Sequence, residues 1–253
     1  MGTISKALHL LNYFSADLPE IGLTRFVQLT GVDKATLHRR LGELRDCGFL
    51  HQDPVSKTYR LGPAISRLEI VKELTFPARS SALDAIRILN QKVSETVHVS
   101  VVQAAAGLST LAHIDDKSHG NRVHIDANEL LPFHATASGL VVMAYMDPPD
   151  VDAIIQIGMP EFTSDTQTDP SKLRSNLKEI RANGHSRCDG GFELDVVGIA
   201  APLFDHRAKC AGAVAIAAPA SRLTEDIVRR VLPDLKIAAK TITESWQGRH
   251  PAD

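Results

Sequence analysis

The sequence predicts an α+β protein of two domains, in which three helices and a hairpin precede a larger domain of helices around a sheet. The first observation is that apolar residues over residues 1–62 recur at helical spacing in three runs and then give way to two short strand-like runs. The second is that later strand-like runs come in neighbouring pairs, as hairpins do, and not as repeated βαβ units. We expect a domain over residues 1–62, a linker helix over 63–78 and a second domain over 79–249.

The first domain begins with an amphipathic helix whose apolar face comprises Ile4, Ala7, Leu8, Leu11 and Phe14. A second helix over about residues 23–30 ends at Gly31, where a positive φ costs nothing. Asp33 is a good N-cap for a third helix over residues 34–47, which buries Leu37, Leu41 and Leu44. Strand-like runs at residues 49–50 and 59–61 then form a hairpin. This order of elements is that of a winged helix-turn-helix.

With its leucines inward, the third helix presents a polar and basic face that suits the major groove of DNA. The predicted DNA-binding residues are Lys34, Ala35, Thr36, His38, Arg39 and Arg40 on this helix, with Ser56 and Lys57 at the hairpin tip. Arginine can bind guanine or grip phosphate, and threonine can contact phosphate or a thymine methyl group. The alternative is a small helical domain whose exposed face is basic for other reasons.

The charge is divided unevenly between the two domains. Residues 1–62 hold 8 Lys and Arg against 6 Asp and Glu, a net charge of +2, whereas the remainder holds 20 against 24, a net charge of −4. A basic small domain on an acidic larger one is typical of a nucleic-acid reader attached to a sensor or partner domain.

The composition is that of an ordinary globular protein, with 43% hydrophobic and 23% charged residues. The longest apolar runs, residues 139–146 and 211–218, are far shorter than the roughly 20 residues that cross a bilayer, so no membrane partner is expected. Cys47, Cys188 and Cys210 stand apart without a CxxC pair. Their spacing argues against a disulfide framework or a structural zinc cluster, and it favours a reducing cytoplasm.

In the second domain, strands are predicted over residues 96–104, 109–114, 122–125, 196–204 and 211–217. Helices are predicted over residues 137–146, 149–157, 170–183 and 224–246. On the first strand, His98 and Ser100 alternate with Val97, Val99 and Val101. The sequence leaves open which of these two sets faces the core or a pocket.

Several segments together resemble the IclR family of bacterial regulators. The first domain contains KALHLLNYF, YRLG and GVDKATLHRRLGELRDCGFL, and the family's second helix-turn-helix helix typically reads K-S-T-x-H-R-L-L. SETVHVSVV, LPFHATASG, GHSRCDGGFE and GIAAPLFD follow in the family's order, so the resemblance runs from Ser5 to Trp246. It implies a DNA-binding dimer or tetramer with a GAF-like second domain, helices around an antiparallel sheet, that binds a small carboxylate or aromatic metabolite.

A ligand site is predicted where the helix over residues 137–146 begins. Either Thr136 or Ser138 can cap this helix, whose free N–H groups and dipole attract an anion. The resemblance implies that the backbone around His134, Ala135, Thr136, Ala137 and Ser138 holds a ligand carboxylate. Asp189 and Glu193 accept a ligand hydroxyl or only cap turns, and Ala200 lies on a strand whose small residues leave room. The alternative is that a capped helix with small residues simply packs close to a sheet.

The chain departs from the family at this site. Leu140 stands where the family usually has Lys, and Ala215 and Ala217 stand where members often have Ser. We therefore expect a more apolar pocket and a less charged or differently placed ligand.

An enzyme is the first alternative. A metal site can be imagined among His113, Asp115, Asp116, His119, His124 and Asp126, although no HExxH or CxxC pattern supports it and a solvated polar loop explains them as well. Cys188 with His134 or His185 is a conceivable nucleophile and base, but the sequence has no G-x-S-x-G motif, P-loop or dinucleotide-binding motif. No catalytic residue, metal or cofactor is expected.

The sequence thus predicts a cytoplasmic transcriptional repressor. Its expected partners are double-stranded DNA at a palindromic operator, a small-molecule effector that is a carboxylate, and further copies of itself in a homodimer or a dimer of dimers. The alternatives are a dimeric DNA-binding protein that needs no ligand, and a metal-dependent hydrolase.

Overall fold

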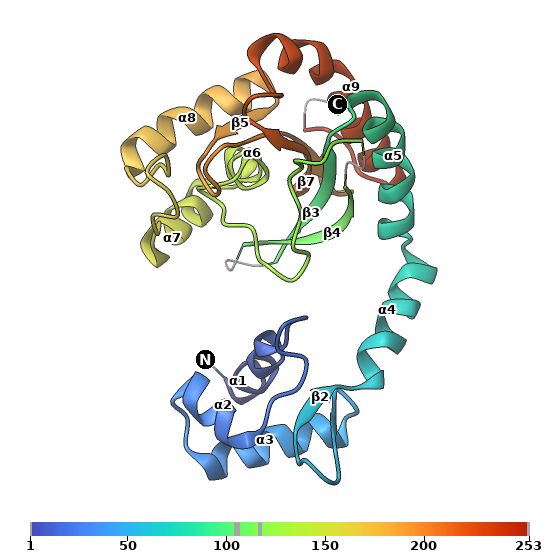
Figure 1. The fold of residues 1–253 in the computed structure, drawn as a ribbon, viewed down its shortest axis with the longest axis vertical. Coiled ribbons are helices and arrows are strands. Elements are labelled where there is room, and N and C mark those ends of the chain that lie inside the picture. Colours follow the sequence, from blue (N-terminus) through green and yellow to red (C-terminus); the bar gives the residue numbers. More distant parts are fainter. Residues whose placement is uncertain (1, 104–106, 116–117, 252–253) are drawn as a thin grey trace. The chain divides into compact units, whose positions relative to one another are not determined.

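A computed structural model describes residues 2–103, 107–115 and 118–251 of the chain (Figure 1). The chain divides into two compact units between Phe76 and Pro77, and each unit is described by itself. The predicted α+β class is confirmed, since a helix-turn-helix unit precedes a unit with an antiparallel sheet flanked by helices. No helix in the described ranges is long and apolar enough to cross a membrane.

The first unit consists of helices and one small hairpin. Its elements are α1 (Thr3–Leu8), the 3₁₀ helix η1 (His9–Tyr13), α2 (Leu23–Thr30), α3 (Lys34–Asp46), β1 (Leu50–Gln52), β2 (Tyr59–Leu61) and α4 (Pro63–Thr75). The strands β1 and β2 pair antiparallel, and Ile21 bridges to Tyr59 beside them. Phe26 packs edge-to-face against Tyr13 and Tyr59, which ties η1, α2 and β2 into one core.

The first helix is shorter than predicted, and its inward face is different. Ile4 and Leu8 are exposed, at 77% and 44%, whereas Leu10 is buried at 3%. The reason is that the chain tightens from α1 into η1, and a 3₁₀ helix turns once every three residues instead of every 3.6. The inward side chains after Ala7 therefore do not follow the α-helical spacing.

Along α4 no residue is buried, although the helix carries several large apolar side chains. Those exposed are Leu68, Ile70, Val71 and Leu74. The apolar residues do not gather on one narrow stripe, since Ile70 and Val71 are neighbours on the helix.

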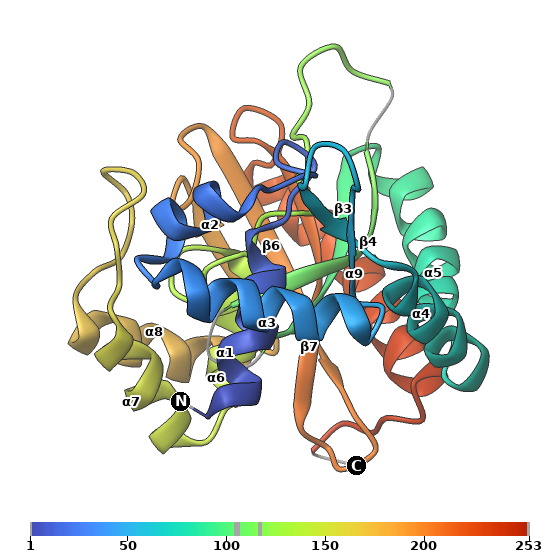
Figure 2. The ribbon, with the colours of Figure 1, turned by 90° about the horizontal axis from the view of Figure 1, so that it is seen from below.

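The second unit is a five-stranded antiparallel sheet with helices on both faces. Its elements are α5 (Ala78–Val93), β3 (Thr96–Val102), β4 (Leu108–Ile114), α6 (Ala137–Tyr145), α7 (Pro148–Ile157), α8 (Pro170–Asn183), β5 (Ser186–Asp189), β6 (Val196–Phe204), β7 (Cys210–Pro219) and α9 (Glu225–Ser245). The strand order is β4-β3-β7-β6-β5. In Figure 2, α5 and α9 lie on one side of the sheet strands and α6, α7 and α8 on the other.

The sheet differs from the prediction in two places. Residues 122–125 form no strand, because Val123 and Ile125 are buried against Ala217 without joining the ladder. Conversely, Ser186–Asp189, where no strand was predicted, forms the edge strand β5 and pairs with β6. Its four residues are too few and too polar to give a strand pattern.

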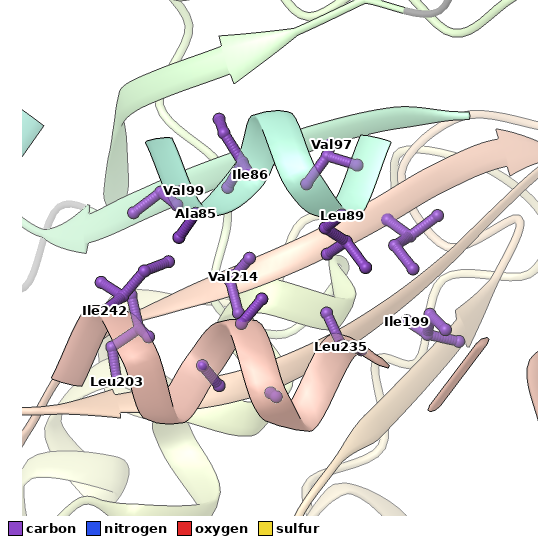
Figure 3. Close-up of a cluster of buried hydrophobic side chains, with 14 of the residues drawn as sticks. Ala85, Ile86, Leu89, Val97, Val99, Ile199, Leu203, Val214, Leu235 and Ile242 are labelled. Atoms are coloured by element: carbon purple, nitrogen blue, oxygen red, sulfur yellow. The ribbon is translucent and has the colours of Figure 1, made fainter. Parts of the chain in front are cut away.

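Both faces of the sheet are covered by apolar layers. Figure 3 shows one layer, where Ile86 and Leu89 of α5 and Leu235 of α9 pack over Val99 and Val214 of the sheet. On the opposite face α6 is buried over eight of its nine residues, from Ala137 to Ala144, and α8 packs outside it. A helix that is apolar all round belongs in such an interior, so α6 lies between the sheet and α8.

Candidate functional site

The helix α3 in the first unit is positioned by its N-cap and by its leucines. Gly31 ends α2 with φ +67°, and the Asp33 carboxylate accepts a hydrogen bond from Thr36 N at 2.9 Å, which also lowers the pKa of Asp33. Leu37, Leu41 and Leu44 are all buried, as predicted. The side of α3 opposite these leucines is therefore turned to the surface.

The predicted DNA-binding residues of α3 do not share one environment. Lys34, Ala35, His38 and Arg39 are exposed, whereas Thr36 and Arg40 are half-buried. At about 100° per residue, Arg39 stands about 200° around the helix from Leu37 and points away from the core. Its guanidinium lies 3.2 Å from the Glu43 carboxylate on the same exposed face.

Arg40 lies on a different side of α3 from Arg39. It stands about 60° from Leu37, beside the core. It borders a hollow that is also lined by Lys6, His9 and Tyr13 of the first two helical segments. Its Nε atom is buried and has no hydrogen-bond partner among the described residues. Arg40 is therefore partly built into the domain, while Arg39 is free to reach outward.

The hairpin tip is held by the Asp53 carboxylate. This group accepts hydrogen bonds from Val55 N at 2.8 Å and from Ser56 N at 2.7 Å, and these bonds lower the pKa of Asp53. The Ser56 hydroxyl is also engaged, with Asp53 and with Thr58. Lys57 follows with φ +59° and is exposed, so its ammonium group extends from an ordered turn.

A cavity of about 80 Å³ opens in the second unit at the start of α6. Because one water needs roughly 10–15 Å³ of such space, the cavity has room for several waters or a compact organic molecule. It is bounded by the N-terminus of α6, the strands β3, β6 and β7, and the segments 123–131 and 188–193. Five of the predicted ligand residues line it, namely Ala135, Thr136, Ala137, Ser138 and Glu193.

The other three predicted ligand residues lie away from the cavity lining. His134 Nε2 bonds to Pro160 O at 2.9 Å, and the His134 ring contacts Phe162. Asp189 is paired with Arg187 at 2.7 Å, on the strand β5. Ala200 shares a face of β6 with Gly198, which lines the cavity, but it lies two residues further along, in the apolar core under α6.

The N-terminus of α6 is capped by Thr136 and not by Ser138. Thr136 Oγ1 accepts a hydrogen bond from Gly139 N at 3.0 Å and donates one to Pro132 O at 2.8 Å. The first bond of the helix runs from Leu140 N to Thr136 O. The N–H groups of Ala137 and Ser138 therefore have no acceptor within the helix, and both residues line the cavity.

His98 forms the inner wall of the cavity, which settles the orientation of β3. Val97 and Val99 pack in the core beneath α5 and α9, so His98 faces the opposite side. Its Nε2 lies 3.2 Å from Ser138 Oγ, and its Nδ1 is buried without a partner in the described part of the chain. Burial lowers the pKa of His98 to about 4, with a smaller effect from His113, so the imidazole is neutral near pH 7.

Three carboxylates also line the cavity, and the sequence analysis identified only one of them as a ligand residue. They are Asp126, Glu129 and Glu193. Although Glu193 as a residue is exposed, its carboxyl group loses hydration beside the cavity, which raises its pKa, and the charge of Glu129 adds to the effect. No Lys or Arg is among the described residues of the lining. The residues 126–129 gave no periodic signal that would connect them to Glu193, because the two segments meet only in the fold.

The predicted alternatives for catalysis find little support in the geometry. No group of three or more His, Cys, Asp or Glu within the described ranges could hold a metal ion, and Asp116 lies outside those ranges. The Cys188 thiol donates to Ala135 O at 3.2 Å, and burial raises its pKa to about 11, so it is a poor nucleophile at neutral pH. His185 contacts Asn183 O instead of Cys188.

Comparisons with known proteins cover both units. The profile described as the bacterial transcriptional regulator IclR C-terminal domain matches residues 75–244, and the IclR helix-turn-helix profile matches residues 3–54. A solved structure of an IclR-type putative regulator from Silicibacter sp. TM1040 is 39% identical, with a TM-score of 0.93 over 99% of this chain and 98% of that one.

Two further relatives are more distant. The HTH-type transcriptional regulator XynR of Escherichia coli is 25% identical over 88% of both chains. An IclR homologue from Microbacterium hydrocarbonoxydans, solved in complex with 4-hydroxybenzoate, is 22% identical, with a TM-score of 0.78 over 97% of this chain and 99% of that one. At this identity the second likeness concerns the fold alone.

Proposed function

The chain belongs to the IclR family of bacterial transcriptional regulators, and on that premise we propose that it is a repressor whose binding to operator DNA changes when a small organic acid occupies the cavity at α6. The observation that carries the proposal is this cavity, with a helix N-terminus and the buried His98 in its wall. Such a repressor acts where its DNA lies, in the bacterial cytoplasm.

On the DNA side, the exposed residues of α3 are proposed to read the duplex. Arg39 and His38 face outward from the start of α3, where a recognition helix meets base edges in the major groove. Lys34 and the hairpin Lys57 add positive charge that can neutralise phosphates, and phosphate contacts position a protein without specifying sequence. Ser56 is a weaker candidate, since its hydroxyl is already bonded within the hairpin.

The repressor is proposed to act as a homodimer or a dimer of dimers on a palindromic operator. A symmetric dimer presents two identical heads to half-sites one or more helical turns apart, each turn being about 34 Å. The exposed apolar side chains of α4 support a contact between subunits, because water-exposed leucine and isoleucine side chains gain stability when a partner covers them. Ile70 and Leu74, four residues apart on one side of the helix, are the residues that such a contact would bury.

On the sensor side, the carboxylate of the effector is proposed to bind the N–H groups of Ala137 and Ser138. They lie at the positive end of the α6 dipole, and both residues line the cavity. The homologue that binds 4-hydroxybenzoate supports a ligand of this size and class. The effector shifts the equilibrium between two arrangements of the repressor, and only one of these arrangements fits the operator.

The experiment combines DNA binding with thermal unfolding of the full-length protein. A labelled duplex from the region upstream of the chain's own gene measures DNA affinity, and 4-hydroxybenzoate serves as the ligand probe. A ligand at 100 times its Kd stabilises the folded state by about 2.7 kcal/mol, which a thermal shift detects readily. Ser138→Asp places a negative charge where the carboxylate binds, and it should abolish the ligand response while DNA binding persists.

Ser138→Ala is the matched control, since it removes the hydroxyl without adding charge and should retain most of the response. An unaltered ligand response in Ser138→Asp would refute the anion site. A wild-type protein that binds the duplex but is stabilised by no carboxylate would instead support the ligand-independent DNA-binding protein.

A further inference from the structure

We propose that the effector carries a hydrogen-bond donor, preferably an ammonium group, in addition to its carboxylate, so that it is an amino-substituted organic acid or, second best, a hydroxy acid. The inference rests on the proposed function and concerns the same cavity. It follows from the mixed lining of that cavity, which includes both the N-terminus of α6 and three carboxylates.

Three exposed acidic residues line the cavity, and two of them are unpaired in the described part of the protein. Glu129 and Glu193 make no ion pair or side-chain hydrogen bond within the described ranges, and they repel one another. Asp126 accepts hydrogen bonds from Asn128, its neighbour in the same loop. Elsewhere the chain does pair a buried carboxylate, as Glu95 with Arg222 at 2.6 Å. A cationic or hydrogen-bond-donating group on the ligand would supply the missing partner for Glu129 and Glu193.

No Lys or Arg among the described lining residues reverses this preference. His98 is buried at 6% exposure, is neutral near pH 7 and leaves its Nδ1 unpartnered, so it can exchange one hydrogen bond with a ligand but cannot balance a second negative charge. Leu140, at the position where the family usually has Lys, is buried in the core around α6 and is not among the described lining residues. The N–H groups of Ala137 and Ser138 remain as the binding place for one carboxylate.

The rest of the lining includes small apolar residues. Ala137, Gly198, Ala215 and Ala217 line the cavity, and none carries a polar side chain. A short hydrocarbon or an aromatic ring fits between them, because such a group fills apolar space without leaving a polar atom unpaired. A second carboxylate on such a ligand would be repelled by Glu129 and Glu193, so we expect dicarboxylates to be poor ligands.

The experiment compares four probes that share one ring and one carboxylate. Full-length protein at pH 7.5 is titrated with benzoate, 4-hydroxybenzoate, 4-(aminomethyl)benzoate and terephthalate, and Kd values are obtained from thermal shifts and from calorimetry. We expect 4-(aminomethyl)benzoate to bind most tightly and 4-hydroxybenzoate next. Terephthalate should bind weakest, at least about tenfold weaker than 4-(aminomethyl)benzoate, since a single favourable charge contact supports a ratio of that order.

The cause is tested with a double variant, Glu129→Gln with Glu193→Gln. The ratio of the Kd values for terephthalate and 4-(aminomethyl)benzoate should fall to about threefold or less, because the amides no longer repel the second carboxylate. Glu179→Gln is the matched control, since Glu179 is exposed on α8 and is absent from the cavity lining, and it should leave the ratio unchanged.

Three results would overturn the inference. The first is terephthalate or benzoate binding as tightly as 4-(aminomethyl)benzoate, and the second is a preference that persists in the double variant. The third is the absence of binding by 4-(aminomethyl)benzoate and 4-hydroxybenzoate in a protein that still binds its DNA and responds to another acid. In each case the DNA titration and the Ser138→Asp comparison report separately on the proposed function, so the two failures can be told apart.

Discussion

Arg39 and Arg40 are neighbours in the sequence, but the structure assigns them opposite consequences on substitution. Arg39 faces outward from α3, while Arg40 borders the core with its Nε buried and unpartnered among the described residues. We therefore expect Arg39→Ala to weaken DNA binding with little effect on stability. Arg40→Leu should leave DNA binding intact and stabilise the folded protein.

The size of the Arg39 effect follows from its exposure. Its ion pair with Glu43 has both side chains more than half exposed, at 61% and 53%, so losing the pair changes the free energy of unfolding by less than about 0.5 kcal/mol. A lost bidentate base contact weakens binding by about 1–3 kcal/mol per head, and a dimer loses two. If Arg39 instead contacts phosphate, the slope of log K against log[salt] falls by about 0.9 per head.

The size of the Arg40 effect follows from its burial. A buried donor without a partner costs about 1–3 kcal/mol, and the Arg40 terminal groups recover part of that by reaching solvent. Leucine, which the family pattern has at this position, removes the buried Nε and keeps the apolar contact in the hollow beside Tyr13. We expect a gain of about 1 kcal/mol in the free energy of unfolding of the first unit.

The assay is an anisotropy titration of a labelled operator duplex at several salt concentrations, together with urea unfolding of each variant. Arg39→Ala should lower DNA affinity by at least about fivefold, the equivalent of 1 kcal/mol, with an unchanged unfolding midpoint. The reasoning is refuted if Arg40→Leu loses as much DNA affinity as Arg39→Ala. It is also refuted if Arg39→Ala changes neither the affinity nor the salt slope.

Two further predictions concern stability. Because the pKa of His98 is about 4 in the folded state and 6.5 in an unfolded chain, the unfolded state takes up the proton first as the pH falls. Through this group the free energy of unfolding should drop by about 2 kcal/mol from pH 7 to pH 5. In His98→Gln the free energy of unfolding, measured with urea, should change less over that pH range. Gly139→Ala should destabilise the second unit by more than about 2 kcal/mol in the same assay, since its Cβ would lie 2.3 Å from Phe133 O. The matched control Gly42→Ala, in open space on α3, should gain about 0.5–1 kcal/mol; equal effects at the two glycines would contradict the close approach at α6.

The parts of the fold that could be predicted are those with strong local signals. The helix α2 and the start of α3 follow from one glycine with positive φ and one aspartate cap, and both residues act as expected. The helix α8 runs from Pro170 to Asn183 as predicted, because proline starts it and Gly184 ends it with φ +69°. Where capping residues, prolines and glycines mark both ends of a helix, the helix can be predicted from the sequence without the tertiary structure.

The errors occur where burial and backbone pairing diverge. Val123 and Ile125 alternate like a strand, but their alternation reflects contact with Ala217 and not a ladder. The strand β5 shows no apolar alternation, yet it pairs with β6 because Gly184 and the following residues bring the chain back to the sheet edge. Leu10 is buried through the change from α1 to η1, which no residue in that segment announces.

Only part of the ligand site could be predicted from the sequence, because its residues come from segments that meet only in the fold. Its anion-binding end lies in one segment, so the cap Thr136 and the small residues around it could be recognised together. Its other groups are separated by tens of residues. His98 alternates with valines on β3, and helices or loops cover both faces of this strand. On such a strand the alternation of polar and apolar residues does not show which set faces the core, because both sets are buried.

The position of α6 explains why His98 borders a cavity and not a closed core. An imidazole in a sheet covered on both faces must find hydrogen-bond partners or leave them unmade, and Ser138 at the start of α6 supplies one of two. Had α6 begun one turn earlier, its own body would have covered His98 as it covers Ala200. The helix begins instead at Ala137, directly beside His98, so the imidazole and the first turn of α6 border the same space. The arrangement that leaves these groups unsatisfied is thus the same one that creates a place for a polar ligand.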